Sequence, residues 1–182
     1  MRIYVPEGIP LVYLSPGELF FSIRPSAVRT VLGSCIAVLI HSPALRAGAI
    51  CHALLPRPMT KCAFECSSCS MEERDAMIFV DGSVQLMLRR FEEHGAGPSR
   101  LEAKVFGGAA FTDTRGAASI GAKNALAAHS ALKRRGVRVV DSDTGGDKAR
   151  KVLYLTHTGQ AIVRTIQRTT TDEGAALVGN YD

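Results

Sequence analysis

Two side chains of this sequence have the types and the spacing of a nucleophile and its base. Cys35 follows Gly33-Ser34 and opens a short apolar run, and His52 lies in a second apolar run seventeen residues later. An imidazole can take the proton of a thiol, and the resulting thiolate can attack a carbonyl carbon. The pair therefore indicates acyl chemistry, provided that the fold brings the two residues together.

Either residue alone would be more typical of a hydrophobic core. Gly33 gives Cys35 the flexible, exposed approach that a reactive thiol needs. Cys51 lacks such a glycine and lies within a hydrophobic string, so we expect it to be structural. We expect surface positions for the other four histidines, which are His41, His94, His129 and His157.

Two adjacent strands would place Cys35 and His52 side by side. The apolar runs 30–40 and 48–56 flank a turn signal at Ser42-Pro43, which predicts a hairpin. Upstream, residues 11–14 and 19–23 are predicted as strands on either side of the turn 15–18. A further strand, 27–32, leads to the cysteine.

The rest of the chain alternates less regularly. Apolar residues at helical spacing predict one helix over Met71–His94, and the run 121–135 predicts another, which ends at Gly136. Strands are expected at 101–106 and 137–140, a tight turn at 143–146, and a hairpin formed by 152–155 and 161–166. This order lacks a regular βαβ alternation, so it predicts an α+β fold. We attribute Gly107-Gly108 to backbone freedom near a site, not to a phosphate loop.

Three further cysteines, Cys62, Cys66 and Cys69, lie in a polar stretch at 57–70. Their C-x3-C-x2-C spacing matches the cluster motif of radical S-adenosylmethionine enzymes, but the chain lacks the βα repeats of that barrel. A zinc site would need a fourth ligand with convincing spacing. We therefore expect a variable surface loop with incidental thiols, no metal and no organic cofactor.

Composition narrows the class of protein. The 182 residues predict a single domain, 1–182, with a polar tail at 169–182, and 46% hydrophobic residues are ordinary for a globular chain. The net charge of +5 comes from scattered Lys and Arg, and aromatics are only 6%, which argues against nucleic-acid binding. We see no export signal and no run long enough to span a membrane, so we expect a reducing cytoplasm.

Several linked motifs resemble one known family. The runs T-V-L-G-S-C-I-A-V from Thr30 and G-A-I-C-H-A-L-L-P from Gly48, followed by motifs at 102–109, 120–124 and 143–146 and by Arg150, are similar to the chemoreceptor glutamine deamidases of bacterial chemotaxis, the CheD family. The resemblance covers roughly residues 14–164. It implies a Cys–His–Thr triad in which Cys35 is the nucleophile, His52 the base and Thr30 the residue that orients the imidazole.

The resemblance also implies a fold, a reaction and partners. The fold would be a layered β-sandwich with helices packed on the outside, similar to cysteine-dependent deamidating toxins. The reaction would convert glutamine side chains on the cytoplasmic helices of methyl-accepting chemotaxis receptors to glutamate, with release of ammonia. A CheC-type chemotaxis phosphatase would be a partner, with Phe111 as a candidate contact, and we expect a monomer.

Two alternatives stay open at this point. A protease or a transglutaminase-like enzyme would use the same Cys–His pair. A regulatory partner of a CheC-type phosphatase would need no catalysis at all.

Overall fold

The computed structural model describes residues 5–57, 72–110 and 119–166. They form a four-stranded sheet, in the order β1-β3-β8-β9, and a five-stranded sheet, in the order β2-β5-β4-β6-β7. The strands are β1 Leu11–Tyr13, β2 Leu19–Ser22, β3 Ala27–Leu32, β4 Ile36–Ser42, β5 Ala47–Ala53, β6 Glu102–Gly107, β7 Arg138–Thr144, β8 Ala149–Leu155 and β9 Gln160–Ile166. The helices are α1 Glu73–Ala76, α2 Val80–Glu93 and α3 Ile120–Arg134, with a 3-10 turn at Pro98–Arg100.

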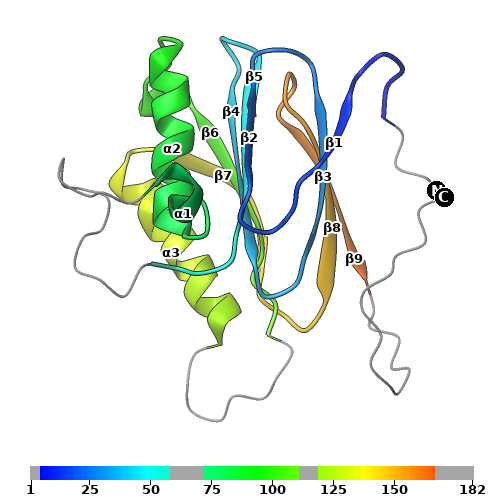
Figure 1. The fold of residues 1–182 in the computed structure, drawn as a ribbon, viewed down its shortest axis with the longest axis vertical. Coiled ribbons are helices and arrows are strands. Elements are labelled where there is room, and N and C mark those ends of the chain that lie inside the picture. The colour runs from blue at the N-terminus through cyan, green and yellow to red at the C-terminus, as the bar shows by residue number, and fades with distance from the viewer. Residues whose placement is uncertain (1–4, 58–71, 111–118, 167–182) are drawn as a thin grey trace.

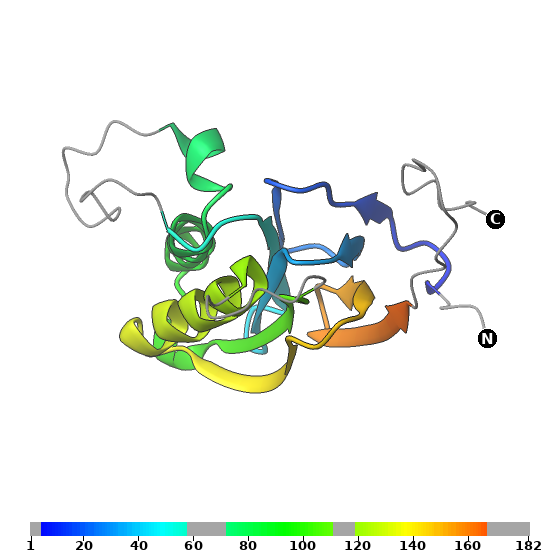
Figure 2. The same cartoon turned by 90° about the horizontal axis from the view of Figure 1, so that it is seen from below.

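The elements stack in three layers. The two sheets face each other, and the helices cover the outer side of the five-stranded sheet (Figure 1); the view from below shows the same order (Figure 2). One apolar cluster fills the space between the helices and the five-stranded sheet, and a second fills the space between the two sheets. The predicted α+β fold is confirmed.

The hairpin β4–β5 is buried on both faces, because it lies between the helices and the four-stranded sheet. Alternate residues of β4 belong to the two different clusters: Ile36 and Val38 face the helices, whereas Ala37 and Leu39 face the other sheet. The predicted hairpin is confirmed, with Ala37 opposite His52 in the antiparallel register. This continuous apolar pattern is typical of a strand covered on both sides.

The strands at either end of the turn 15–18 belong to different sheets. β1 pairs with β3 in parallel, whereas β2 pairs with β5 in an antiparallel arrangement. The turn therefore carries the chain from one sheet to the other. Gly17 N donates to His52 O, which fixes this crossing beside the histidine.

The single helix predicted over Met71–His94 is wrong. The structure has α1 and α2, interrupted at 77–79. The interruption has a long-range cause: Leu54 N and Leu55 N both donate to Ile78 O, and Val80 N donates to Leu55 O. Because these backbone groups pair with the segment after β5, they are not available for helical hydrogen bonds.

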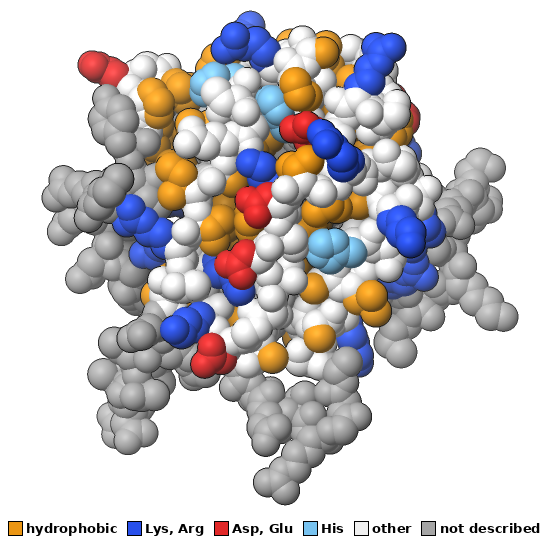
Figure 3. Space-filling model, turned by 180° about the vertical axis from the view of Figure 1, so that it is seen from behind, with side chains coloured by type: hydrophobic (Ala, Val, Ile, Leu, Met, Phe, Trp, Pro, Cys, Tyr) orange, Lys and Arg blue, Asp and Glu red, His pale blue; other side chains and the backbone are white. Residues whose placement is uncertain are grey.

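The other predicted elements differ only at their ends. The helix α3 and the hairpin β8–β9 are confirmed, and β7 continues to Thr144, into the stretch predicted as a turn. No helix among the described residues has both the length and the apolar composition needed to cross a bilayer. On the face shown in Figure 3, Lys and Arg side chains are dispersed and acidic side chains lie among them.

Several predicted features lie outside the described residues. They are the greater part of the polar stretch 57–70 with Cys62, Cys66 and Cys69, the candidate contact Phe111, and the tail 169–182.

Candidate active site

The three candidate residues lie on different segments: Thr30 on β3, His52 on β5, and Cys35 in the loop directly before β4. Cys35 directly precedes Ile36, which pairs with Ala53, and Ala53 directly follows His52, so the two segments lie side by side at this end of the hairpin. Thr30 belongs to β3 of the opposing sheet and lies between Val28 and Leu32, which both face the layer between the sheets. The structure thus brings Thr30 and His52 together across the two sheets, with the backbone of Cys35 at the adjoining end of the hairpin.

A hydrogen bond joins the two sheets at this point. The Thr30 hydroxyl oxygen lies 2.8 Å from His52 Nδ1 and 2.8 Å from the carbonyl oxygen of Leu14. The hydroxyl has one proton, and a carbonyl only accepts, so Thr30 donates to Leu14 and accepts from His52 Nδ1–H. The neutral imidazole then has its lone pair on Nε2, the nitrogen available to receive a proton.

Burial sets the resting protonation of the pair. The His52 side chain is 2% exposed, and desolvation lowers the pKa of His52 to about 4, with the Leu14 carbonyl and Glu18 acting in the opposite direction. Burial also raises the pKa of the Cys35 thiol, and its own backbone N–H opposes this. Near neutral pH these pKa values favour a neutral thiol and a neutral imidazole.

The loop that carries Cys35 is held by its carbonyl groups. The carbonyl oxygens of residues 33–35 accept, in chain order, from Ala109 N at 2.9 Å, Asn124 Nδ2 at 3.0 Å and Gly108 N at 2.8 Å. Within the described parts of the chain, no acceptor is found for the N–H groups of Gly33 and Ser34, whereas the N–H group of Cys35 interacts with its own sulfur.

The glycine pair after β6 explains how closely this loop is approached. Gly107 and Gly108 have φ values of 110° and 68°, and a Cβ atom on Gly107 would lie 2.4 Å from the carbonyl oxygen of Cys35. Side chains are excluded there by both conformation and space. The predicted backbone freedom of this glycine pair is confirmed, and the pair lies against the Cys35 loop.

The stretch 143–146 is tied to the same glycines by Arg150. The Arg150 guanidinium is 5% exposed and donates to the Asp143 carboxylate at 2.7 and 2.9 Å and to Gly145 O at 2.9 Å. Gly145 N in turn donates to Gly107 O at 2.9 Å. The arginine lowers the pKa of Asp143, and the ion pair fixes the loop one contact away from Cys35.

Sequence reasoning found the three candidate residues but assigned no role to Asn124, which contacts the Cys35 loop. The available signal was a polar residue on the buried stripe of a helix that otherwise carries small and apolar residues. Cys51, by contrast, is fully buried against the helices, and burial raises its pKa to about 11, which confirms the predicted structural position.

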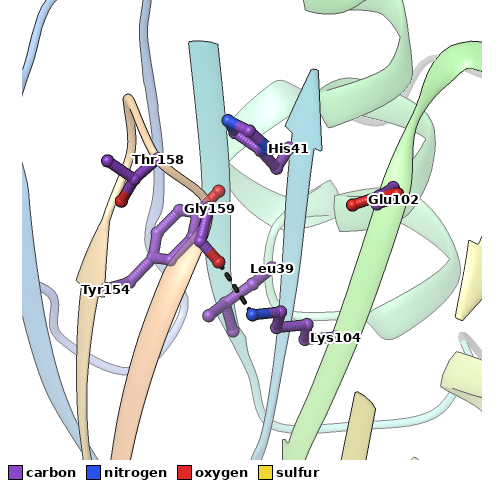
Figure 4. Close-up of a pocket in the computed structure, with 7 residues that line it drawn as sticks. All are labelled: Leu39, His41, Glu102, Lys104, Tyr154, Thr158 and Gly159. Atoms are coloured by element: carbon purple, nitrogen blue, oxygen red, sulfur yellow. Dashed lines mark hydrogen bonds between the residues drawn. The ribbon is translucent and has the colours of Figure 1, made fainter. Parts of the chain in front are cut away.

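A pocket of about 80 Å³ lies at the opposite end of the layer between the sheets. Figure 4 shows His41, Tyr154 and Lys104 around it, with Lys104 Nζ 2.9 Å from Gly159 O. His41 and His157 are both partly buried, each with one enclosed ring nitrogen, so neither is fully exposed as predicted. The hairpin turn before β9 packs over the His41 ring and encloses it.

Comparisons with known proteins agree with one another. The family model "CheD chemotactic sensory transduction" matches residues 64–165. The chain is 36% identical over 168 residues to the probable chemoreceptor glutamine deamidase CheD 2 of Geobacter sulfurreducens, covering 90% of this chain and 95% of that protein. It is 33% identical over 151 residues to the chemoreceptor glutamine deamidase CheD of Thermotoga maritima, covering 82% and 88%.

Solved structures give a more distant likeness. A Neisseria meningitidis protein described as family-model DUF152 aligns over 82% of this chain and 76% of its own, with a TM-score of 0.47 and 15% identity. The matched part of the family model begins at residue 64, after Thr30, Cys35 and His52. The alignments to the two deamidases are longer and each cover more than four fifths of this chain. On the family model and these relatives, the chain belongs to the CheD family.

Proposed function

We propose that this protein is a protein-glutamine deamidase that converts glutamine side chains of methyl-accepting chemotaxis receptors to glutamate. One observation carries the proposal: His52 Nδ1–H donates a hydrogen bond to the Thr30 hydroxyl, which leaves Nε2 as the base. Both relatives quoted above are named as chemoreceptor glutamine deamidases, which supports the substrate class.

The reaction starts from the neutral pair. His52 Nε2 takes the thiol proton, and the Cys35 sulfur attacks the carbon of the glutamine carboxamide. The C=O electrons move to oxygen, and backbone N–H groups of residues 33–35 donate to this oxyanion. The C–N bond then breaks, and the leaving nitrogen takes the proton from His52 and departs as ammonia, which leaves a thioester on Cys35.

Water completes the cycle. The imidazole, neutral again, takes a proton from water, and the hydroxide adds to the thioester carbon. The C–S bond breaks, the glutamate carboxylate leaves and the thiol regains its proton. Thr30 contributes by holding the ring in the tautomer and orientation that both halves require. The chemistry uses only groups of this chain, the substrate and water.

Several finer features belong to the same proposal. We place the reaction in the cytoplasm, on the cytoplasmic helices of the receptors, and take the monomer as the active form. A CheC-type phosphatase is the proposed regulatory partner. The likeness of the fold to cysteine-dependent deamidating toxins also stays a prediction.

An intact-mass assay tests the proposal. The protein is mixed with a receptor cytoplasmic fragment, alongside Cys35→Ala and the matched control Cys51→Ala, which removes a buried thiol from the other face of the hairpin. We expect a gain of about one mass unit per modified glutamine, with ammonia released. The gain should persist in Cys51→Ala and disappear in Cys35→Ala.

The other outcomes separate the alternatives. Cleaved peptides in place of a mass gain would indicate a protease. An unchanged mass in several receptor fragments, together with a cellular role that survives in Cys35→Ala, would favour the regulatory partner.

A further inference from the structure

The side chain of Asn124 bridges the two chain segments that carry the proposed nucleophile and base. It is fully buried in α3, and its Nδ2 donates to Ser34 O at 3.0 Å and to Leu54 O at 2.9 Å. Ser34 directly precedes Cys35, and Leu54 follows His52 by two residues. Both protons of one amide group are therefore used to connect the two segments.

The bridge lies where the hairpin β4–β5 opens. The last backbone pair of this ladder is Ile36 with Ala53, and the next positions along the two segments are 35 and 54. Beyond that pair the chains diverge, because Leu54 N donates instead to Ile78 O. The Asn124 side chain thus supplies a connection at the point where the ladder ends.

The side-chain amide of Asn124 has a defined orientation, and its burial disfavours folding. With Nδ2 and Oδ1 exchanged, the oxygen would face two carbonyl oxygens, so the orientation with Nδ2 as donor is fixed. Oδ1 is then buried and has no hydrogen-bond partner in the described part of the chain. An unpaired buried acceptor disfavours folding, so this asparagine is a poor choice for stability alone.

Helix α3 is held tightly against the same loop. Ser119 caps its N-terminus by accepting from Ala122 N at 3.1 Å. A Cβ atom on Gly121 would lie 2.4 Å from Gly108 O, and Gly108 N donates to Cys35 O. Asn124 therefore projects from a rigid support, as a group that sets the position of another must.

We propose that Asn124 is a positioning residue that holds the Cys35 loop against the end of the His52 strand, so that the thiol stays within reach of the imidazole. This role deepens the proposed deamidase chemistry and rests on it. By fixing Ser34 O, the amide also fixes the peptide group between Ser34 and Cys35, whose N–H faces the proposed oxyanion.

A double-mutant cycle on the reactivity of Cys35 tests this role without any receptor. The rate of Cys35 alkylation by iodoacetamide is followed by peptide mass mapping near neutral pH, in wild type, Asn124→Ala, His52→Ala and the double variant. We expect Asn124→Ala to slow alkylation about tenfold when His52 is present, because the thiol loses its base. In the His52→Ala background we expect the same change to alter the rate by less than about twofold.

Two further variants separate positioning from folding. Asn124→Asp keeps the side-chain volume, but its carboxylate cannot donate to the two carbonyls, so it should show the same coupling to His52. Leu126→Gly weakens α3 at an exposed position while leaving both donors and the Ser119 cap in place, and its alkylation rate should stay within about twofold of wild type.

Equal slowing by Asn124→Ala in both backgrounds, or no slowing in either, would overturn the positioning role. Failure of both Asn124 variants to fold would make the residue structural and would overturn it as well. If His52→Ala alone left the alkylation rate unchanged, the Cys35–His52 pair itself would fail. That result is distinct, because it removes the proposed function together with the positioning role.

Discussion

His52 and His41 occupy the same hairpin but opposite ends of the layer between the sheets. His52 lies on β5 opposite Ala37, and His41 lies on β4 opposite Gly48. Both rings are buried enough that desolvation lowers their pKa values. Burial perturbs both histidines, although His52 is fully buried and His41 only partly so.

Their partners differ. His52 Nδ1 is bound by Thr30, whose hydroxyl is in turn fixed by Leu14 O, so the free nitrogen has a set direction. The His41 ring interacts with the His157 backbone and packs against Gly159, while its Nε2 is enclosed without a hydrogen-bond partner among the residues that the structure describes. A perturbed pKa therefore does not define a catalytic base; an oriented ring beside a nucleophile does.

The largest expected effect comes from removing each ring in turn. His52→Ala should lower the rate of ammonia release from a receptor fragment by about a thousandfold or more, because a nucleophile and its base fail together. His41→Ala should change this rate by less than about threefold, since distant sites act independently. Steady-state ammonia assays measure both rates. Comparable losses in the two variants would show that His52 has no special role as the base.

A smaller effect concerns the pH dependence of stability. The pKa of His52 is about 4 in the folded protein against an ordinary value of 6.5, so the unfolded chain binds the proton more readily between these values. The free energy of unfolding should therefore fall as the pH drops from 6.5 toward 4, by up to about 3 kcal/mol from this group.

Urea unfolding across this pH range measures that dependence. In His52→Ala the free energy of unfolding should fall less between pH 6.5 and 4, because the contribution of His52 is missing. In His41→Ala that contribution should remain. An acid limb of kcat/KM well below pH 6.5 would agree with the same lowered pKa. A variant without His52 but with the full pH dependence would show that another group is responsible.

The smallest effect is expected from the residue that orients the ring. Thr30→Val keeps the shape of the side chain and removes the hydroxyl, so kcat should fall about tenfold to a hundredfold with little change in KM. Thr156→Val is the matched control, because Thr156 is also a buried threonine, with a hydroxyl that binds the Ser26 backbone away from the site. Equal losses of kcat in both variants would reduce Thr30 to a structural residue.

The sequence by itself determined the central hairpin and the two residues of the proposed chemistry. Continuous apolar runs on either side of Ser42-Pro43 predict two buried strands, and their lengths bring Cys35 and His52 near each other. Such patterns are set by residues that are close together in the chain, so a single sequence is enough to detect them. The structural position of Cys51 followed from the same apolar pattern.

Only the tertiary structure decided what surrounds the pair. The break between α1 and α2 arises from backbone pairing with Leu54 and Leu55, and the sheet exchange at residues 15–18 depends on β5. The Nδ1 tautomer of His52 depends on Thr30 of the other sheet, and the Cys35 loop depends on Asn124, ninety residues further along the chain. Each is a contact between distant segments, so local propensity carries no signal for it.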